Sequence, residues 1–123
     1  ETGRGNVFVV SDGEVVTPPL DGRILPGVTR ATVLHLLAAL GIGAREGPVA
    51  LTDLPAAEEV FVTNAIGGVR TVASCEEVGA WPSGPVTQRH VRFELSSLAP
   101  IHPWPCSLLV TKVFSASLVM VTR

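Results

Sequence analysis

Short runs of strand-forming residues, separated by turn signals, open the chain. Residues 6–10 are rich in Val and Phe, and residues 14–17 form a second run of the same kind. The Asp12–Gly13 pair between them predicts a tight hairpin, because glycine tolerates the positive φ that a type I′ turn requires. A Pro-Pro pair at positions 18–19 ends the second strand, since proline lacks the N–H that a sheet ladder uses. The pattern therefore predicts a β-hairpin over residues 6–17.

Apolar residues then recur at helical spacing. A loop rich in Gly and Pro covers residues 20–28, and the pattern after it predicts a helix over residues 29–40. Gly41 and Gly43 are expected to end this helix, because glycine readily adopts the left-handed conformation of a C-terminal cap. The residues that share its apolar face are Val33, Leu34, Leu37 and Leu40.

The following residues predict further short elements. Val49 and Leu51 indicate a short strand, and Asp53 is placed to cap a short helix that runs to about Glu58. Pro55 is tolerated in the first turn of that helix. After it we expect a strand over residues 60–63, Gly67–Gly68 as a link, a strand over residues 69–73, a loop over residues 79–85 and a helix over residues 86–94.

The tail from residue 95 differs in character from the rest of the chain. Prolines at positions 100, 103 and 105 precede an apolar run over residues 107–121, which Lys112 interrupts. Two short strands, a poorly ordered segment and a peptide foreign to the original reading frame are all open interpretations. The valines of the run favour a loosely packed edge strand. We therefore treat residues 1–94 as one unit and residues 95–123 as an atypical tail.

Composition narrows the class of protein. The chain has 123 residues, 46% apolar and 16% charged, which suits one globular domain. A net charge of −2 provides no basic field for nucleic acid. Residues 1–6 do not form a signal peptide, and no apolar run reaches the ~18–20 residues of a membrane span. We expect a cytoplasmic protein that does not enter a membrane, and the lack of a first Met suggests a piece of a longer one.

The residues that commonly bind metals show no useful spacing. Cys75 and Cys106 are far apart in sequence, and a reduced pair is the simpler interpretation than a long-range disulfide. His35, His90 and His102 share no ligand spacing, and His35 is expected to be a packed or half-exposed residue of the helix. We therefore predict no metal site.

One segment offers a binding mechanism on physical grounds alone. Residues 25–30 run from a Gly-containing loop into the predicted helix. The first backbone N–H groups of a helix have no partner within it, and together with the helix dipole they attract an anion such as phosphate. Thr29 adds a hydroxyl group. Without further information, a Thr29 that only caps the helix is the simpler interpretation.

A series of motifs along residues 1–94 favours the anion site over a simple cap. Each motif is weak by itself, but their order and spacing resemble those of the C-terminal domain of the class IV (fold type IV) pyridoxal-phosphate aminotransferases. That family includes branched-chain and D-amino-acid aminotransferases and 4-amino-4-deoxychorismate lyases. The segments that carry the resemblance are Glu1 with Asn6-Val7-Phe8, Asp12-Gly13, Thr17 to Leu20, Ile24 to Arg30, Asp53-Leu54, Ala57 to Ala65 and Gly68 to Val72.

The resemblance implies a fold, a cofactor and a set of contacts. The fold would be mixed α/β (α+β), a twisted and largely antiparallel sheet with outer helices, and it would hold pyridoxal 5′-phosphate. Glu1 would pair with the pyridinium nitrogen of the cofactor, and Leu25 would pack against its ring. Val28–Thr29 would donate hydrogen bonds to the phosphate, and Asn64–Ala65 would form a second phosphate-binding turn that borders the substrate. The alternatives are a merely solvated Glu1 and an ordinary turn residue at position 64.

The resemblance also leaves one catalytic group out. The Schiff-base lysine of the family would lie a few dozen residues before Glu1, and the only lysine of this chain is Lys112. We therefore assign no catalytic residue here and expect this chain alone to be inactive. The resemblance implies that the parent protein is an enzyme, a homodimer like its family, that acts on a small amino substrate. The alternative is a non-catalytic, truncated domain with a vestigial phosphate site.

The reaction of the parent enzyme depends on a single turn. Residues 63–65, Thr-Asn-Ala, resemble the lyases of the family more than the Gly-Thr-Ala type of turn in branched-chain aminotransferases. This places 4-amino-4-deoxychorismate lyase slightly ahead of amino-acid transamination as the implied activity.

Overall fold

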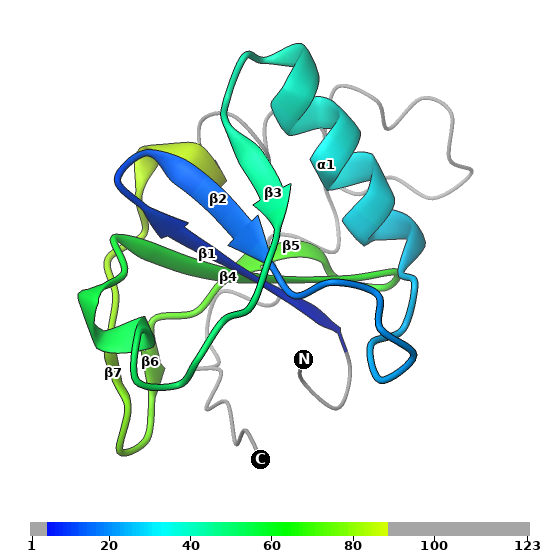
Figure 1. The fold of residues 1–123 in the computed structure, drawn as a ribbon. Helices are drawn as coiled ribbons and strands as arrows, with labels where there is room; N and C mark the ends of the chain where they lie inside the picture. Colours follow the sequence, from blue (N-terminus) through cyan, green and yellow to red (C-terminus); the bar gives the residue numbers. More distant parts are fainter. Residues whose placement is uncertain (1–4, 89–123) are drawn as a thin grey trace.

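The strand runs and turn signals of the sequence fold into a five-stranded sheet with a helix on one face (Figure 1). The structure, a computed structural model, describes residues 5–88. In chain order the elements are β1 (Asn6–Ser11), β2 (Glu14–Thr17), α1 (Val28–Ala39), β3 (Ala44–Glu46), the short 3₁₀ helix η1 (Leu54–Ala56), β4 (Glu59–Asn64), β5 (Gly68–Thr71), β6 (Ser74–Cys75) and β7 (Gly79–Ala80).

The sheet is largely antiparallel, and its strand order is β3-β2-β1-β4-β5. The central strand β1 pairs antiparallel with β2 and β4, and β4 pairs antiparallel with β5. The β1–β2 turn has the predicted geometry, with positive φ at Asp12 (51°) and Gly13 (74°), as a type I′ turn requires. The predicted fold class, mixed α/β with a twisted, largely antiparallel sheet, is confirmed.

Strand β3 was not predicted, and the strand predicted at Val49 and Leu51 is wrong. Residues 47–50 are irregular and residues 51–53 form a turn. Instead, residues 44–46 pair in parallel with β2, flanked by hydrogen bonds from Val15 N–H to Gly43 O (2.8 Å) and from Gly47 N–H to Thr17 O (2.9 Å). The segment Ala-Arg-Glu contains no strong strand former, so the free edge of β2 decides its conformation.

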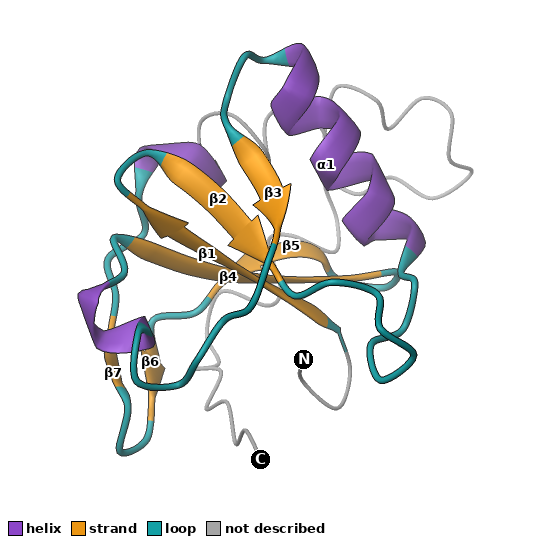
Figure 2. Cartoon of the chain, in the orientation of Figure 1, coloured by secondary structure: helices purple, strands orange, loops and turns teal. Residues whose placement is uncertain are grey.

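The two faces of the sheet bury separate hydrophobic clusters. On the face toward α1, Phe8 and Phe61 stack with ring centroids 4.8 Å apart, and Val33 and Leu37 of the helix pack there. The other face packs against η1 and the β6–β7 pair, which lie away from α1 (Figure 2). The indole N–H of Trp81 donates to the carbonyl of Leu54 at 2.7 Å and joins these elements. The hydrophobic cluster on the face away from α1 contains Val7, Val9, Leu54, Val60, Val62, Val72, Cys75 and Trp81.

Helix α1 lies one residue earlier than predicted at each end. Gly41 (φ 72°) ends it, with hydrogen bonds from Ile42 N–H to Leu37 O and from Gly41 N–H to Ala38 O, the pattern of a Schellman cap. Leu40, the predicted last residue of the helix, is therefore its cap residue and is 37% exposed. His35 is exposed, so the expectation of a packed or half-exposed residue is wrong.

Smaller elements also differ from the predictions. Asp53 makes no side-chain capping hydrogen bond to η1, which ends at Ala56 rather than near Glu58. Strand β5 ends at Thr71, two residues before the predicted end. Residues 79–80 pair as β7 within the predicted loop. The predicted helix at 86–94 is helical from residue 85 to residue 88, and its remainder lies outside the described residues.

Several predictions fall beyond the part of the chain that the structure describes. They concern Glu1, Cys106, Lys112, the histidines at positions 90 and 102 and the tail over residues 95–123. Among the described residues, no helix is long and apolar enough to span a membrane, and no group of His, Cys, Asp or Glu side chains is arranged to hold a metal ion.

Candidate functional site

The start of α1 has no side-chain cap. Gly27 precedes the helix in an extended conformation (φ −65°, ψ 134°), and no acidic residue lies in the first turn. Thr29 is the second residue of the helix, so the simpler interpretation of Thr29 as the N-terminal cap is wrong. Within the part of the chain that the structure describes, no side chain caps the first N–H groups of α1, which a helix does not satisfy internally.

The second predicted turn lies directly beside this helix start. The hydroxyl of Thr29 donates a hydrogen bond to the backbone carbonyl of Asn64 at 3.1 Å, across 35 residues of sequence. Figure 1 shows the N-terminal end of α1 next to the loop that follows β4. The expectation that residues 28–29 and residues 64–65 lie together is therefore confirmed, although the hydroxyl of Thr29 already has an acceptor.

The side chain of Asn64 shapes the turn that follows β4. Its carbonyl oxygen Oδ1 accepts hydrogen bonds from the N–H of Ile66, at 3.0 Å, and from the N–H of Gly67. This arrangement is an Asx turn, in which an Asn side chain takes the place of a backbone acceptor. Asn64 thus stabilises the turn through its side chain, and its backbone carbonyl binds Thr29 of α1. The next residue, Ala65, is exposed.

Exposed apolar side chains lie close in sequence to Thr29 and to Asn64. Leu25 is 72% exposed, Val28 80% and Ile66 80%, and they come from the loop before α1, the first residue of α1 and the turn after β4. A polar helix start bordered by apolar side chains suits a ligand that joins an anionic group to a flat apolar ring.

Two buried polar side chains support the loop and the helix start, and the sequence analysis assigned neither of them a role. Asn6, 5% exposed at the beginning of β1, donates from Nδ2 to the carbonyl of Leu25 at 2.9 Å. Arg30, 3% exposed, donates to the carbonyl of Pro18 at 3.0 Å and pairs with Glu46. Both residues belong to the quoted motifs, and their polar character on otherwise apolar faces was the signal that could have singled them out.

The loop before the helix also carries an exposed ion pair. The side chain of Arg23 donates to the carboxylate of Asp21, and this hydrogen bond is the main reason why the pKa of Asp21 lies below its usual value. The same carboxylate raises the pKa of Arg23. Both side chains are exposed to solvent, so this pair belongs to the surface of the loop and not to the helix start.

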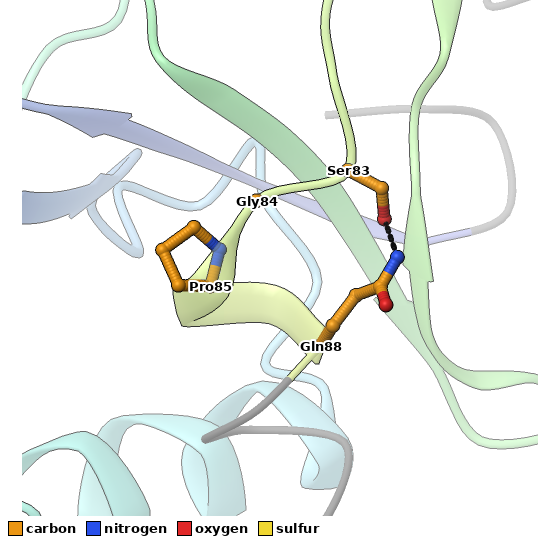
Figure 3. A pocket seen from close by; sticks show the side chains of 4 residues that line it. All are labelled: Ser83, Gly84, Pro85 and Gln88. Atoms are coloured by element: carbon orange, nitrogen blue, oxygen red, sulfur yellow. Dashed lines mark hydrogen bonds between the residues drawn. The ribbon is translucent and has the colours of Figure 1, made fainter.

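A shallow hollow lies elsewhere, at the opposite end of β4. It has a volume of about 430 Å³ and is lined by Ser83, Gly84, Pro85 and Gln88 (Figure 3). Next to it, the buried carboxylate of Glu59 accepts hydrogen bonds from the N–H groups of Val86 (3.0 Å) and Thr87 (2.9 Å). Glu59 begins β4 and Asn64 ends it, so roughly 16 Å of strand separates the hollow from the helix start.

Comparison with known proteins identifies the family of this chain. The family model for amino-transferase class IV matches residues 1–75. The branched-chain-amino-acid aminotransferase of Escherichia coli K12 is 38% identical over 86 residues, which cover 68% of this chain and 28% of that protein. The chain therefore spans less than a third of the length of this relative.

Solved structures agree with the family match. An aminotransferase from Brucella abortus bound to the co-factor PLP is 32% identical, with a TM-score of 0.70, over 76% of this chain and 34% of that one. A putative 4-amino-4-deoxychorismate lyase from Legionella pneumophila is 27% identical, with a TM-score of 0.74, over 79% of this chain and 36% of that one. An aminotransferase and a putative 4-amino-4-deoxychorismate lyase thus both occur among the structural neighbours.

Proposed function

The chain belongs to the class IV aminotransferase family, and we propose that it forms the cofactor-holding part of a pyridoxal-phosphate enzyme that acts on a small amino substrate. The observation that carries this proposal is the uncapped start of α1, joined to the turn after β4 by the Thr29–Asn64 hydrogen bond. Two segments far apart in sequence thereby form one anion site.

The described residues fit the phosphate and ring of such a cofactor. The uncapped N–H groups of α1 would donate to the phosphate, and the helix dipole favours its negative charge. The exposed side chain of Leu25 lies on the loop before them and would cover the ring. Because the Thr29 hydroxyl donates to Asn64, we propose that Thr29 reaches the phosphate through its backbone N–H and that its hydroxyl keeps the second turn in place.

Two further contacts belong to the proposal. Glu1 would keep the pyridinium nitrogen protonated, because a carboxylate stabilises the charged form of a neighbouring base. Ala65, exposed at the tip of the turn after β4, would border the amino substrate. When bound, the cofactor supplies an electron-accepting ring for carbanion chemistry. The lysine that moves the substrate proton would come from a segment outside residues 1–123, and the parent enzyme would be a cytoplasmic homodimer.

Two reactions remain candidates for the parent enzyme. The 38% identity to a branched-chain-amino-acid aminotransferase favours transamination of an amino acid. The Thr-Asn-Ala turn at residues 63–65 and the likeness to a putative 4-amino-4-deoxychorismate lyase favour the lyase reaction. Assays of the parent enzyme with a branched-chain amino acid and a 2-oxo acid, and separately with 4-amino-4-deoxychorismate, would distinguish the two.

The anion site itself is testable with the 123-residue chain. Pyridoxal 5′-phosphate and inorganic phosphate are titrated into ¹⁵N-labelled protein, and the amide signals of residues 28–30 are followed by NMR. We expect both ligands to shift these signals in a saturable way, and pyridoxal without phosphate to leave them in place. Saturable shifts at residues 83–88 instead would move the site to the hollow at the other end of β4 and contradict the proposal.

The same titration addresses the non-catalytic alternative. Binding of phosphate without any turnover by the parent protein would favour a truncated domain with a vestigial site. Turnover by the parent protein, abolished by removal of pyridoxal phosphate and restored by its addition, would favour the enzyme.

A further inference from the structure

Asn6 connects the central strand of the sheet to the loop before α1. Its Nδ2 donates to the carbonyl of Leu25 at 2.9 Å, and the same carbonyl accepts the N–H of Gly27 at 2.9 Å. Asn6 itself is 5% exposed and pairs with Thr63 in the β1–β4 ladder. The amide is therefore fixed by a rigid strand, whereas the loop that it holds is exposed.

Gly27 leaves room for this amide. A Cβ atom at Gly27 would lie 2.3 Å from Oδ1 of Asn6, closer than any real contact allows, while the Cβ of Arg30 would be at an ordinary 3.5 Å. The φ of Gly27, −65°, is accessible to any residue, so backbone conformation gives no reason for glycine here. The close approach of the Asn6 side chain explains why a glycine is needed at position 27.

The side chain of Leu25 adds little to the position of the loop. Leu25 is 72% exposed, so burial of its side chain contributes little to the position of its carbonyl. On the C-terminal side of Gly27, the Thr29 hydroxyl donates a hydrogen bond to the backbone carbonyl of Asn64. The loop and the helix start are thus connected to β1 on one side of Gly27 and to the end of β4 on the other.

We propose that Asn6 is a positioning residue of the anion site: it fixes the loop at Leu25–Gly27 so that the first N–H groups of α1 converge on the ligand. This inference rests on the proposed function. Asn6 touches neither phosphate nor substrate and acts through the backbone of the loop. An anion site depends on donors held in place before the ligand arrives, because a loop that must be ordered on binding reduces affinity.

The test uses a double-mutant cycle of Asn6→Ala and Gly27→Ala in the 123-residue chain. Inorganic phosphate is titrated by NMR at the amides of residues 28–30, and the midpoint of thermal unfolding is measured in parallel. Asn6→Ala should weaken phosphate binding about five- to tenfold, the effect of one lost hydrogen bond. Gly27→Ala should weaken it similarly in the parent sequence but add little in the Asn6→Ala background, because the oxygen that the new methyl group would meet is gone.

Two variants complete the design. Asn6→Leu keeps about the size of the side chain and removes the donor without adding a charge, so it should weaken phosphate binding even where Asn6→Ala proves too unstable to study. Thr32→Ala removes an exposed hydrogen bond to the carbonyl of Val28 in the same turn of α1 and should leave phosphate affinity unchanged.

The outcomes separate the two proposals. Asn6 variants that unfold at lower temperature yet bind phosphate as tightly as the parent chain would overturn the positioning role and leave the anion site intact. Additive effects of Asn6→Ala and Gly27→Ala would also overturn it. A parent chain whose residues 28–30 do not respond to phosphate would overturn the proposed function, and the role of Asn6 with it.

Discussion

The hydroxyl of Thr29 and the backbone carbonyl of Asn64 form a 3.1 Å hydrogen bond between the first turn of α1 and the end of β4. Neither residue is near the other in sequence, and each belongs to a different half of the described chain. The contact brings together two features that are weak signals in the sequence, a helix start after Gly27 and an Asx turn at Asn64.

Replacing Thr29 by Val tests how much this contact matters. Valine keeps the shape of the side chain and removes the hydroxyl, so the carbonyl of Asn64 loses its donor. We expect the free energy of unfolding to fall by about 1 kcal/mol and the affinity for inorganic phosphate to fall roughly fivefold, the usual net effect of one hydrogen bond. Urea unfolding and NMR titration measure the two quantities.

Thr29→Ser is the matched control, because it keeps the hydroxyl. It should retain most of the phosphate affinity that Thr29→Val loses. Equal losses in the two variants would mean that the methyl group, and not the hydrogen bond to Asn64, supports the site.

The opposite end of β4 depends on a buried carboxylate. Glu59 is 4% exposed and accepts hydrogen bonds from the N–H groups of Val86 and Thr87 and from the Thr87 hydroxyl, the last at 2.6 Å. Glu59→Gln should lower the free energy of unfolding by about 1–3 kcal/mol, because an amide group cannot accept all of these hydrogen bonds and leaves buried donors unpaired. Glu76→Gln, at an exposed position, should change it by less than about 0.5 kcal/mol.

A substitution at Gly84 tests the role of the buried Glu59 side chain independently. A Cβ atom there would lie 2.2 Å from the carboxyl carbon of Glu59. Gly84→Ala should therefore destabilise the protein through Glu59, and urea unfolding of the Gly84→Ala, Glu59→Gln double variant should show a loss smaller than the sum of the two single losses. A simple sum would mean that the two residues act separately.

Local signals predicted the parts of the fold that local chemistry determines. Asp12, Gly13 and Gly41 adopt positive φ, a conformation that is expected from glycine and from an Asp-Gly turn. Strand β3 could not be predicted in this way, because Ala44–Glu46 becomes a strand only through its pairing with β2. Glutamate is rarely buried, so nothing in the sequence marked Glu59 as part of the core.

The candidate site was predicted from the resemblance more than from the residues. Physical reasoning located a helix start near Thr29 but favoured a simple cap, and the structure places the cap at Gly27. The proximity of Asn64 followed only from the family pattern. The roles of Asn6 and Arg30 depend on contacts with Leu25 and Pro18, 19 and 12 residues away, which no local pattern reports.

The Asp21–Arg23 pair predicts a measurable pH dependence. The hydrogen bond from Arg23 lowers the pKa of Asp21, so the carboxyl should titrate below its usual range in ¹³C NMR spectra. Because the folded-state pKa lies below the unfolded one, any stabilisation from the pair is present above the unfolded-state pKa and is lost as the pH falls through the folded-state pKa. Arg23→Gln should return the pKa of Asp21 toward its usual value; an unchanged titration would show that the pair does not persist in solution.

The last prediction concerns covalent capture of pyridoxal 5′-phosphate by this chain. A Schiff base needs an amine held beside the aldehyde carbon, and the family resemblance puts that lysine before Glu1, whereas Lys112, the only lysine of residues 1–123, follows Glu1 by more than a hundred residues. After incubation with micromolar cofactor and reduction with borohydride, intact-mass spectrometry should therefore find no stoichiometric adduct, although phosphate binding at residues 28–30 persists. The Lys112→Arg variant serves as the control, since it should bind phosphate equally well and show the same background of adduct. A stoichiometric adduct that peptide mapping assigns to Lys112, and that Lys112→Arg abolishes, would place the reactive amine within this chain and contradict the assignment of the Schiff-base lysine to a segment outside it.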